Sequence, residues 1–324
     1  MLDQYGRSIE YLRISVTDRC NFRCVYCMPE KGLDWLPKPQ ILSYEEITAV
    51  VQQLAPLGLK RLRITGGEPT IRPDLVTLIG MLRAVPGIED IALSTNGVKL
   101  PQMAVALRAA GLDRVNMSAD SLRPSRIAEI ARRSFAFDPV TAARAATDAG
   151  LDPLKLNVVV MRGVNDDEIE DFAALTVDQP WHVRFIEIMP VGDMAAAEFA
   201  HVMPSDELLA RIAARFGALK AADGPARGNG PARYQRIRGA AGSIGVITPM
   251  SHTYCDSCNR VRLTADGHLR TCLYGDHEVN LRDPLRAGEP LEPLFRQALA
   301  DKPKEHELLQ LRVGGLKALS QVGG

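Results

Sequence analysis

The chain lacks three features that would assign it to a broad class at first sight. Its 324 residues contain no apolar run long enough to span a bilayer, since the most apolar stretches are interrupted by charged residues or glycine. Basic and acidic residues number 39 each, so no net charge attracts nucleic acid or a membrane surface. Residues 1–5 contain no basic segment followed by an apolar run, so neither a secretory signal nor disulfides are expected. These absences predict a cytoplasmic protein that holds any anionic ligand with local arginines.

Cysteine is scarce as well, and its placement is informative. The six cysteines form two clusters of three, with none elsewhere in the chain. They are Cys20, Cys24 and Cys27 in the first triad, and Cys255, Cys258 and Cys272 in the second triad. A [4Fe-4S] cluster is normally held by one thiolate per iron, so three thiolates leave one iron open to a ligand that is not protein. The two triads predict two such clusters.

Zinc is the alternative metal, because Cys-x2-Cys pairs often bind zinc with four protein ligands. In the second triad, His252, His268 or His277 could supply the fourth ligand. The first triad has the spacing Cys-x3-Cys-x2-Cys, contains no histidine and fits tetrahedral zinc poorly. Iron–sulfur is therefore predicted for the first triad, and zinc stays open as the alternative for the second.

Strand and helix signals alternate from residue 11 to about residue 216. Strands are predicted over 11–16, 60–65, 90–94, 114–118, 154–160 and 183–188. Helices are predicted over 74–85, 103–110 and 165–175, at the capping box of Ser43 and Glu46, and at Asp138-Pro139. Repeated β–α units predict a parallel sheet with right-handed crossovers, and their number favours a barrel or partial barrel over a doubly wound sheet.

Unusual residues follow the predicted strands at their carboxyl ends. They are the first triad, Gly66-Gly67-Glu68-Pro69, Ser94, Ser118 and Met189. In barrels this end forms the active-site face, so these segments are expected to converge on one mouth. The two glycines alone are compatible with a simple tight turn, and their functional interpretation is close approach of the backbone to a ligand.

The composition changes after residue 216. Residues 221–232 form a linker rich in Gly, Pro and Ala, and a strand is predicted over 243–248. A hairpin over 261–273, turning at Asp266-Gly267, brings Cys258 and Cys272 together. The chain therefore divides into a barrel over 1–220, a linker over 221–232 and a C-terminal region over 233–324.

The first triad, with Tyr26 inside it and Gly-Gly-Glu-Pro one β–α unit later, resembles the signature of radical S-adenosylmethionine enzymes. In that superfamily the open iron of a [4Fe-4S] cluster binds S-adenosyl-L-methionine, and one electron from the cluster breaks a C–S bond to yield a 5′-deoxyadenosyl radical. The resemblance implies that Cys20, Cys24 and Cys27 hold this cluster.

The second triad, the neighbouring Arg260-Val261-Arg262 and the terminal Gly323-Gly324 narrow the resemblance. Together they resemble the GTP 3′,8-cyclases, which perform the first step of molybdenum cofactor biosynthesis. The resemblance runs from Arg13 to Gly324. It implies an incomplete (β/α)6 barrel of the TIM type and a smaller C-terminal region that closes the mouth with a second [4Fe-4S] cluster. The implied reaction removes hydrogen from C3′ of GTP and joins C3′ to C8, giving (8S)-3′,8-cyclo-7,8-dihydroguanosine 5′-triphosphate.

The resemblance also implies roles for individual residues. Tyr26, Gly67, Ser118 and Met189 match positions that line the S-adenosylmethionine site. Arg13, Arg63, Ser94, Lys155, Arg260, Val261 and Arg262 match positions that contact GTP. Cys255, Cys258 and Cys272 would hold the second cluster, whose open iron binds the guanine ring. Gly323 and Gly324 would reach into the active site and be required for cyclisation.

The implied partners are GTP, an external one-electron donor and cyclic pyranopterin monophosphate synthase as the next enzyme, with no nucleic acid and no membrane. Whether the chain forms a homodimer stays open. One alternative is a radical enzyme with an auxiliary cluster that acts on a peptide, but such an enzyme would not need the Arg260-x-Arg262 pair. The other is a non-catalytic electron carrier or a zinc-stabilised binding module, for which a 324-residue β/α chain is larger than necessary.

Overall fold

The computed structural model describes residues 1–134, 137–189, 199–222, 230–275, 277–306 and 321. Six strands of the first part pair in parallel and in chain order. They are β1 (Tyr11–Ser15), β2 (Arg61–Thr65), β3 (Asp90–Thr95), β4 (Arg114–Ser118), β5 (Lys155–Val160) and β6 (His182–Glu187). This arrangement confirms the predicted incomplete (β/α)6 barrel.

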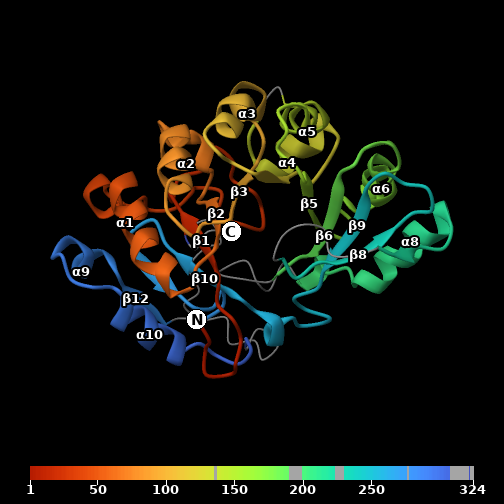
Figure 1. Ribbon diagram of the computed structural model, residues 1–324. Helices are drawn as coiled ribbons and strands as arrows, with labels where there is room; N and C mark the ends of the chain where they lie inside the picture. Colours follow the sequence, from red (N-terminus) through yellow and green to blue (C-terminus); the bar gives the residue numbers. More distant parts are fainter. Residues whose placement is uncertain (135–136, 190–198, 223–229, 276, 307–320, 322–324) are drawn as a thin grey trace.

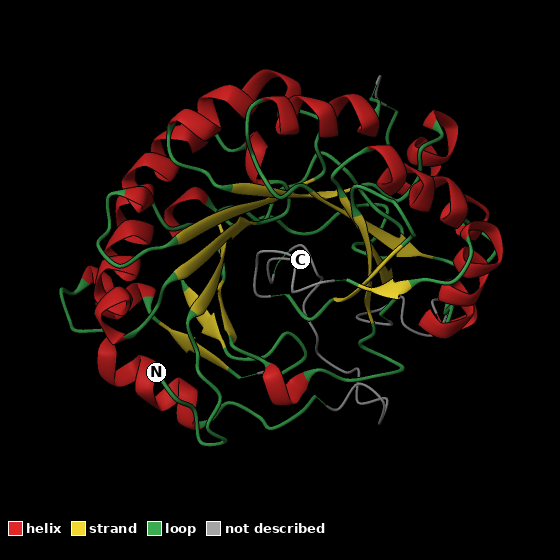
Figure 2. Ribbon diagram, turned by 45° about the vertical axis from the view of Figure 1, so that its right-hand side comes forward, coloured by secondary structure: helices red, strands yellow, loops and turns green. Residues whose placement is uncertain are grey.

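Helices form an outer layer around the curved sheet (Figures 1 and 2). They are α1 (Tyr44–Leu54), α2 (Leu75–Arg83), α3 (Leu100–Ala109), α5 (Pro139–Asp148), α6 (Ile169–Asp178) and α8 (Ser205–Phe216). A further helix, α4 (Pro124–Ala131), follows β4, and sequence patterns did not predict it. Its inner side chains Ile127 and Ile130 face the cavity described below.

Helix starts were predicted with mixed success. The capping box at Ser43 forms, because the Ser43 side chain accepts from Glu46 N and the Glu46 side chain accepts from Ser43 N. Asp138 caps α5 as expected. The helix predicted from Asn165 forms, but its capped start is wrong: α6 begins at Ile169 after a 3-10 turn, and the Asn165 side chain makes no cap. Its amide instead donates to Asp120 O (2.7 Å) and Val159 O (2.9 Å), which ties together two neighbouring loops.

The C-terminal part of the chain extends the same sheet at both edges. Beyond β6 lie β9 (Ser243–Ile247), β8 (Arg233–Arg236) and β7 (Lys220–Ala221), and beyond β1 lie β10 (Arg260–Leu263), β11 (His268–Arg270) and β12 (Glu278–Asn280). Both β9 and β10 run parallel to their barrel neighbours. The β10–β11 hairpin confirms the predicted turn at Gly267, which has a φ of +83°. Two helices, α9 (Arg282–Arg286) and α10 (Glu292–Ala300), follow β12.

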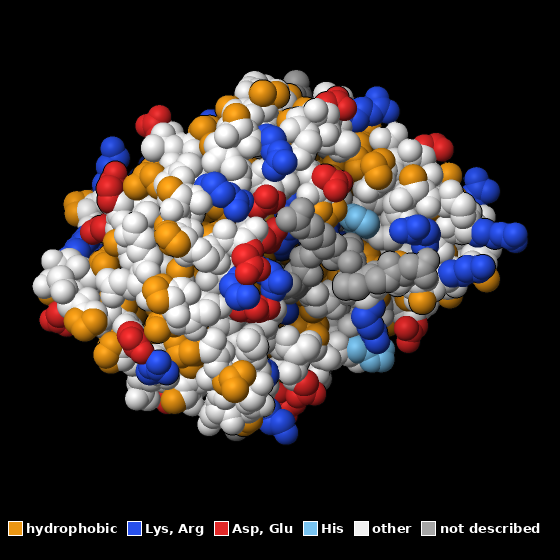
Figure 3. All heavy atoms as spheres, viewed as in Figure 1, with side chains coloured by type: hydrophobic (Ala, Val, Ile, Leu, Met, Phe, Trp, Pro, Cys, Tyr) orange, Lys and Arg blue, Asp and Glu red, His pale blue; other side chains and the backbone are white. Residues whose placement is uncertain are grey.

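Alternation along the strands separates the core from the barrel interior. On β1, Leu12 and Ile14 are buried in the apolar core, while Tyr11 and Arg13 line the interior cavity. Figure 3 shows basic and acidic side chains interspersed over one face of the molecule, in keeping with 39 residues of each sign. Among the described residues, every helix is too short or too polar to traverse a bilayer.

Candidate active site

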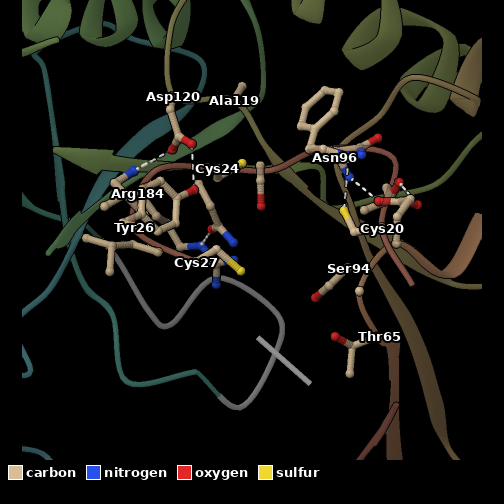
Figure 4. Close-up of a pocket in the computed structure, with 18 of the residues that line it drawn as sticks. Cys20, Cys24, Tyr26, Cys27, Thr65, Ser94, Asn96, Ala119, Asp120 and Arg184 are labelled. Carbon is tan, nitrogen blue, oxygen red and sulfur yellow. Dashed lines mark hydrogen bonds between the residues drawn. The ribbon is translucent and has the colours of Figure 1, made fainter. Parts of the chain in front are cut away.

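A cavity of about 280 Å³ lies inside the curved sheet, at the carboxyl ends of the barrel strands. The loops after β1, β2, β3 and β4 all contribute to its wall, as the strand-end argument predicted. Figure 4 shows Cys20, Cys24 and Cys27 around this space, with Asn96 near Cys20 and Asp120 near Tyr26.

The first triad sits on a loop that packs against the end of α4. Arg23 N donates to Ala131 O (2.8 Å) and Val25 N donates to Ile130 O (3.0 Å), so main-chain bonds hold the loop in place. All three cysteines are half-buried free thiols. Burial raises the pKa of Cys20 to about 12, and burial together with Asp120 raises the pKa of Cys24 well above its usual value.

The donor set fits a metal cluster, although burial by itself disfavours the thiolate form. Iron bound to the thiolates would displace their protons and offset the cost of burying them as anions. Phe22 N donates to Cys20 Sγ (3.3 Å), which is a bond that stabilises the thiolate form. As thiolates, the three cysteines that face this cavity would each supply one ligand to a [4Fe-4S] cluster.

Gly66 and Gly67 are required by close packing of two loops. Gly67 N donates to Thr17 O (2.7 Å), and Glu68 N donates to Arg19 O (2.8 Å). A Cβ placed on Gly67 would lie 2.1 Å from Arg19 O, a distance that no side chain tolerates. The two glycines therefore let their loop approach the backbone just before Cys20. This contact comes in addition to any approach of the same loop to a ligand.

Glu68 fixes the second loop to the end of β3. Its buried carboxylate accepts from Thr95 Oγ1 (2.7 Å), Asn96 N (2.7 Å) and Thr70 N (3.0 Å). Burial raises the pKa of Glu68, although these hydrogen bonds oppose the rise. The Asn96 amide in turn donates to Asn21 Oδ1 (2.8 Å), so the loops after β1, β2 and β3 form one connected unit.

Tyr26 links the cysteine loop to the end of β4. Its hydroxyl donates to Asp120 Oδ2 at 2.6 Å, and Val159 N donates to Asp120 Oδ1 at 2.9 Å. Burial raises the pKa of Asp120 to about 6, even though both hydrogen bonds favour its charged form. The bond fixes the Tyr26 ring in the cavity wall.

Strand register aligns arginines along the inner face of the sheet. Arg262 on β10 is opposite Arg13 on β1, and Arg13 is opposite Arg63 on β2. Arg260 lies two residues from Arg262 and therefore shares its face. All four arginines line the cavity. We call Arg13, Arg63, Arg260 and Arg262 the arginine row.

The arginine row concentrates positive charge in a buried place. Burial, then the guanidinium groups of Arg262 and Arg63, lower the pKa of Arg13 well below its usual value. Burial also lowers the pKa of Arg63 and of Arg262 to about 10. These like charges repel one another and are buried away from water. The arginine row therefore forms a site for an anion with several charges, such as a polyphosphate.

Lys155 lies deeper, at the start of β5 rather than at its carboxyl end. Burial and the cations of Arg184 and Arg114 lower the pKa of Lys155 to about 6. Arg184, on β6, lines the cavity and donates to Asn157 Oδ1 and Asn116 Oδ1, both at 2.8 Å. The cationic wall of the cavity therefore continues toward the bottom of the barrel.

The second triad lies beside β10 and the arginine row. Cys255 belongs to a 3-10 turn, Cys258 N donates to Cys255 O (3.1 Å), and Cys272 follows β11. Burial raises the pKa of Cys255, and the nearby thiols of Cys272 and Cys258 add to the rise. A backbone hydrogen bond from His306 opposes it. The pKa of Cys258 is lowered, because the cations of Lys302 and Arg260 outweigh the effect of burial. The three thiols are thus close enough to influence one another electrostatically.

The structure brings most of the predicted site residues to the cavity wall. These are Cys20, Cys24, Tyr26, Cys27, Gly67, Ser94, Ser118, Met189 and the arginine row. Lys155 and the second triad are not in the wall, and the Val261 side chain is buried in the apolar core. Gly323 and Gly324 lie outside the described residues. Within the described ranges, no three His, Cys, Asp or Glu side chains are arranged to hold a single metal ion.

Sequence patterns missed several residues of the site. Arg184 shares the inner face of β6 with Ile186, so strand alternation could have placed it. Asp120 lies two residues after Ser118, so the same alternation could have placed it. No sequence pattern pointed to His306. Its two ring nitrogens are buried without a hydrogen-bond partner among the described residues. Its ring packs edge-on against the Tyr274 ring, with 4.8 Å between the ring centroids.

Comparison with known families separates the chain into two matched regions. Residues 14–176 match the Radical SAM superfamily, and residues 181–308 match the family Molybdenum Cofactor Synthesis C. Among solved structures, that of Streptococcus suis SuiB bound to S-adenosylmethionine has a TM-score of 0.61 at 12% identity and covers 94% of this chain and 74% of that chain. SuiB bound to its precursor peptide SuiA gives the same TM-score at 13% identity, over 95% of this chain and 74% of that chain. At such low identity, these likenesses confirm the fold alone.

Similarity to curated sequences extends over the full length. The GTP 3′,8-cyclase of Pelotomaculum thermopropionicum is 48% identical, and that of Heliobacterium modesticaldum is 46% identical. Each alignment covers 100% of both proteins. A match of this extent, together with the two family matches, is decisive: the chain belongs to the GTP 3′,8-cyclase family of the radical SAM superfamily.

Proposed function

We propose that this chain converts GTP to (8S)-3′,8-cyclo-7,8-dihydroguanosine 5′-triphosphate, the first step of molybdenum cofactor biosynthesis. The single observation that carries the proposal is one cavity whose wall contains both the first cysteine triad and the arginine row. Such a cavity can hold a radical source and a triphosphate at the same time. The curated relatives named GTP 3′,8-cyclase support the same substrate.

Cys20, Cys24 and Cys27 would hold the first [4Fe-4S] cluster. A cluster bound there supplies the electron for reductive cleavage of S-adenosylmethionine. Tyr26, Gly67, Ser118 and Met189 would surround S-adenosylmethionine, and all four line the cavity. The loop network through Glu68 and Asp120 would keep these residues in fixed positions, which is the main contribution of a protein to cofactor chemistry.

The arginine row and Ser94 would bind GTP from the cavity wall, and Lys155, which is buried behind the wall, would act on it through its charge. Guanidinium groups suit phosphate oxygens because they donate two parallel hydrogen bonds, and Lys155 adds a point charge. Arg184 would join this set from β6. Val261 would contribute main-chain groups only, because its side chain is 1% exposed and faces the core. With the triphosphate held in this way, the ribose would be positioned between the two triads.

Cys255, Cys258 and Cys272 would hold a second [4Fe-4S] cluster that binds guanine. His268 is 3.2 Å from Asp266, and His252 and His277 are each 3.9 Å from an aspartate. A carboxylate is also the usual partner of a zinc-bound imidazole, so metal analysis is the measurement that distinguishes iron–sulfur from zinc at the second triad.

The remaining features of the proposal follow from the family. The chain would take an electron from an external donor and pass its product to cyclic pyranopterin monophosphate synthase in the cytoplasm. Its barrel would span 1–220, its linker 221–232 and its C-terminal region 233–324. Gly323 and Gly324 would be needed for cyclisation, and a homodimer is one oligomeric state to be tested.

The test is an anaerobic reaction of reconstituted protein with GTP, S-adenosylmethionine and a chemical reductant. Chromatography should show deoxyadenosine and cyclised nucleotide together, and iron and sulfide analysis should show two [4Fe-4S] clusters. Deleting Gly323 and Gly324 should keep deoxyadenosine and remove the cyclised product. Deoxyadenosine without any GTP binding would point to a different substrate, such as a peptide, and stoichiometric zinc in active protein would rule out the second cluster.

A further inference from the structure

Lys302, just after α10, directs its ammonium group at the second triad. Lys302 is 2% exposed, so this charge is buried. Its Nζ donates to Cys258 Sγ (3.5 Å), to Arg260 O (3.3 Å) and to Thr271 O. An ammonium group has three protons to donate, and these three acceptors use all of them.

A second cation, Arg7, binds the main chain of the same segment. Arg7 Nη1 donates to Cys255 O (2.9 Å) and Lys304 O (2.8 Å), and Nη2 donates to Pro303 O (2.7 Å). Its Nε pairs with Asp3 Oδ2 at 2.6 Å, so the guanidinium is fixed by the N-terminal loop. Arg7 therefore joins the N-terminus, the Cys255 turn and the segment that carries Lys302.

Together the two cations contact all three parts of the chain that supply the second triad. Arg7 binds the carbonyl of Cys255, whereas Lys302 binds the sulfur of Cys258 and the carbonyl of Thr271, which precedes Cys272. A buried ammonium beside neutral thiols is costly, whereas beside a cluster of thiolates it is compensated. This buried charge therefore suits a negatively charged occupant of the triad.

We propose that Lys302 is a positioning residue for the second cluster: it orients Cys258 through an N–H···S bond and raises the reduction potential of the cluster with its positive charge. The inference rests on the proposed second cluster. Hydrogen bonds to sulfur and local charge are two of the factors that set iron–sulfur potentials. Because Lys302 also binds the carbonyl of Arg260, it links the cluster to the arginine row.

The test compares Lys302→Met with Lys304→Met. Methionine keeps the length of the lysine chain but removes its charge and donors, and Lys304 is an exposed lysine two residues away. Each change is made in the full chain and also in a background in which Cys20, Cys24 and Cys27 are alanine, so that the second cluster is observed alone. The readouts are a potentiometric titration followed by electron paramagnetic resonance, and the rate of iron loss to a chelator.

For Lys302→Met, the ratio of reduced to oxidised second cluster at a fixed potential should fall about tenfold, which is 59 mV for one electron. Iron loss should accelerate about tenfold, which is in the range typical of substitutions at residues that hydrogen-bond to metal ligands. The iron content of the first triad should match the parent, and Lys304→Met should match the parent in every readout.

Three outcomes would overturn the inference. The first is that Lys302→Met leaves the potential of the second cluster and the rate of iron loss unchanged. The second is that Lys304→Met has an equal effect. The third is that Lys302→Met loses the first cluster and cooperative folding, which would give Lys302 a role in general stability. Failure of the proposed function would be seen in the parent protein itself. Metal analysis would then find one cluster only, or zinc at the second triad.

Discussion

At the scale of single residues, Gly67 is the position where a small change should have the largest effect. Alanine there places a Cβ 2.1 Å from Arg19 O, so the loop before Cys20 must move. We expect Gly67→Ala to lose most of the iron of the first triad and to cost about 1–3 kcal/mol of unfolding free energy. Iron analysis and denaturant unfolding of the metal-free protein would measure both effects.

Gly80 provides the matched control. It lies in α2, and a Cβ there would meet no atom within 4 Å. Gly80→Ala should keep the iron and stabilise the protein by about 0.5–1 kcal/mol, because alanine favours a helix interior. Equal iron contents in the two variants would show that the Gly67 loop can adjust.

Lys155 should make GTP binding depend on pH. Burial and neighbouring cations lower its pKa to about 6, so it is mostly neutral above that pH in the free protein. A bound triphosphate favours the charged form and raises this pKa. Binding should therefore take up a proton at pH 8, and affinity should fall as pH rises from 6 toward the pKa of the complex.

Calorimetry in two buffers of different ionisation enthalpy would count the proton. Lys155→Met should abolish the uptake and weaken binding, while Lys99→Met, at an exposed lysine, should change neither. Uptake that persists in Lys155→Met would assign the proton to another group.

At the scale of elements, strand register creates the anion site. Arg262, Arg13 and Arg63 belong to three adjacent strands, yet pairing places them side by side. Arg260→Ala and Arg262→Ala should each remove a charge-assisted hydrogen bond of about 1.5–3 kcal/mol, which weakens GTP binding about ten- to a hundredfold. Equilibrium binding and iron content measure the two effects, and the iron should hardly change.

Arg296, exposed on α10 and paired with Glu292, is the control for these variants. Arg296→Ala should bind GTP like the parent, since surface ion pairs contribute little. Parent-like binding by both Arg260→Ala and Arg262→Ala would place the triphosphate elsewhere.

Elements and site residues differ in how far the sequence predicts them. The cap at Ser43 and the turn at Gly267 depend on residues a few positions apart, so local patterns are sufficient. Asn165 looks equally suited to a cap, but its amide binds Asp120, 45 residues away. The cysteines were predictable from spacing. Lys302 was not, because a single lysine carries no signal until the fold places it beside Cys258.

At the scale of the whole molecule, the second matched region flanks the first at both edges of the sheet. The C-terminal part adds β9 beside β6 and β10 beside β1, so it completes both edges of the barrel sheet. It also supplies two residues of the arginine row. No local pattern predicts such pairing, because it joins strands that are distant in the chain.

The predicted boundary at residue 220 should therefore not mark an independently folding barrel. A fragment of residues 1–220 would expose the edges of β1 and β6, and open parallel edges favour aggregation. We expect this fragment alone to be insoluble or to unfold without cooperativity. Coexpression with residues 221–324 should restore a soluble complex, because the second fragment pairs with both edges. Solubility, circular dichroism and denaturant unfolding would decide. A soluble 1–220 fragment that unfolds cooperatively by itself would show that the barrel strands need neither neighbour.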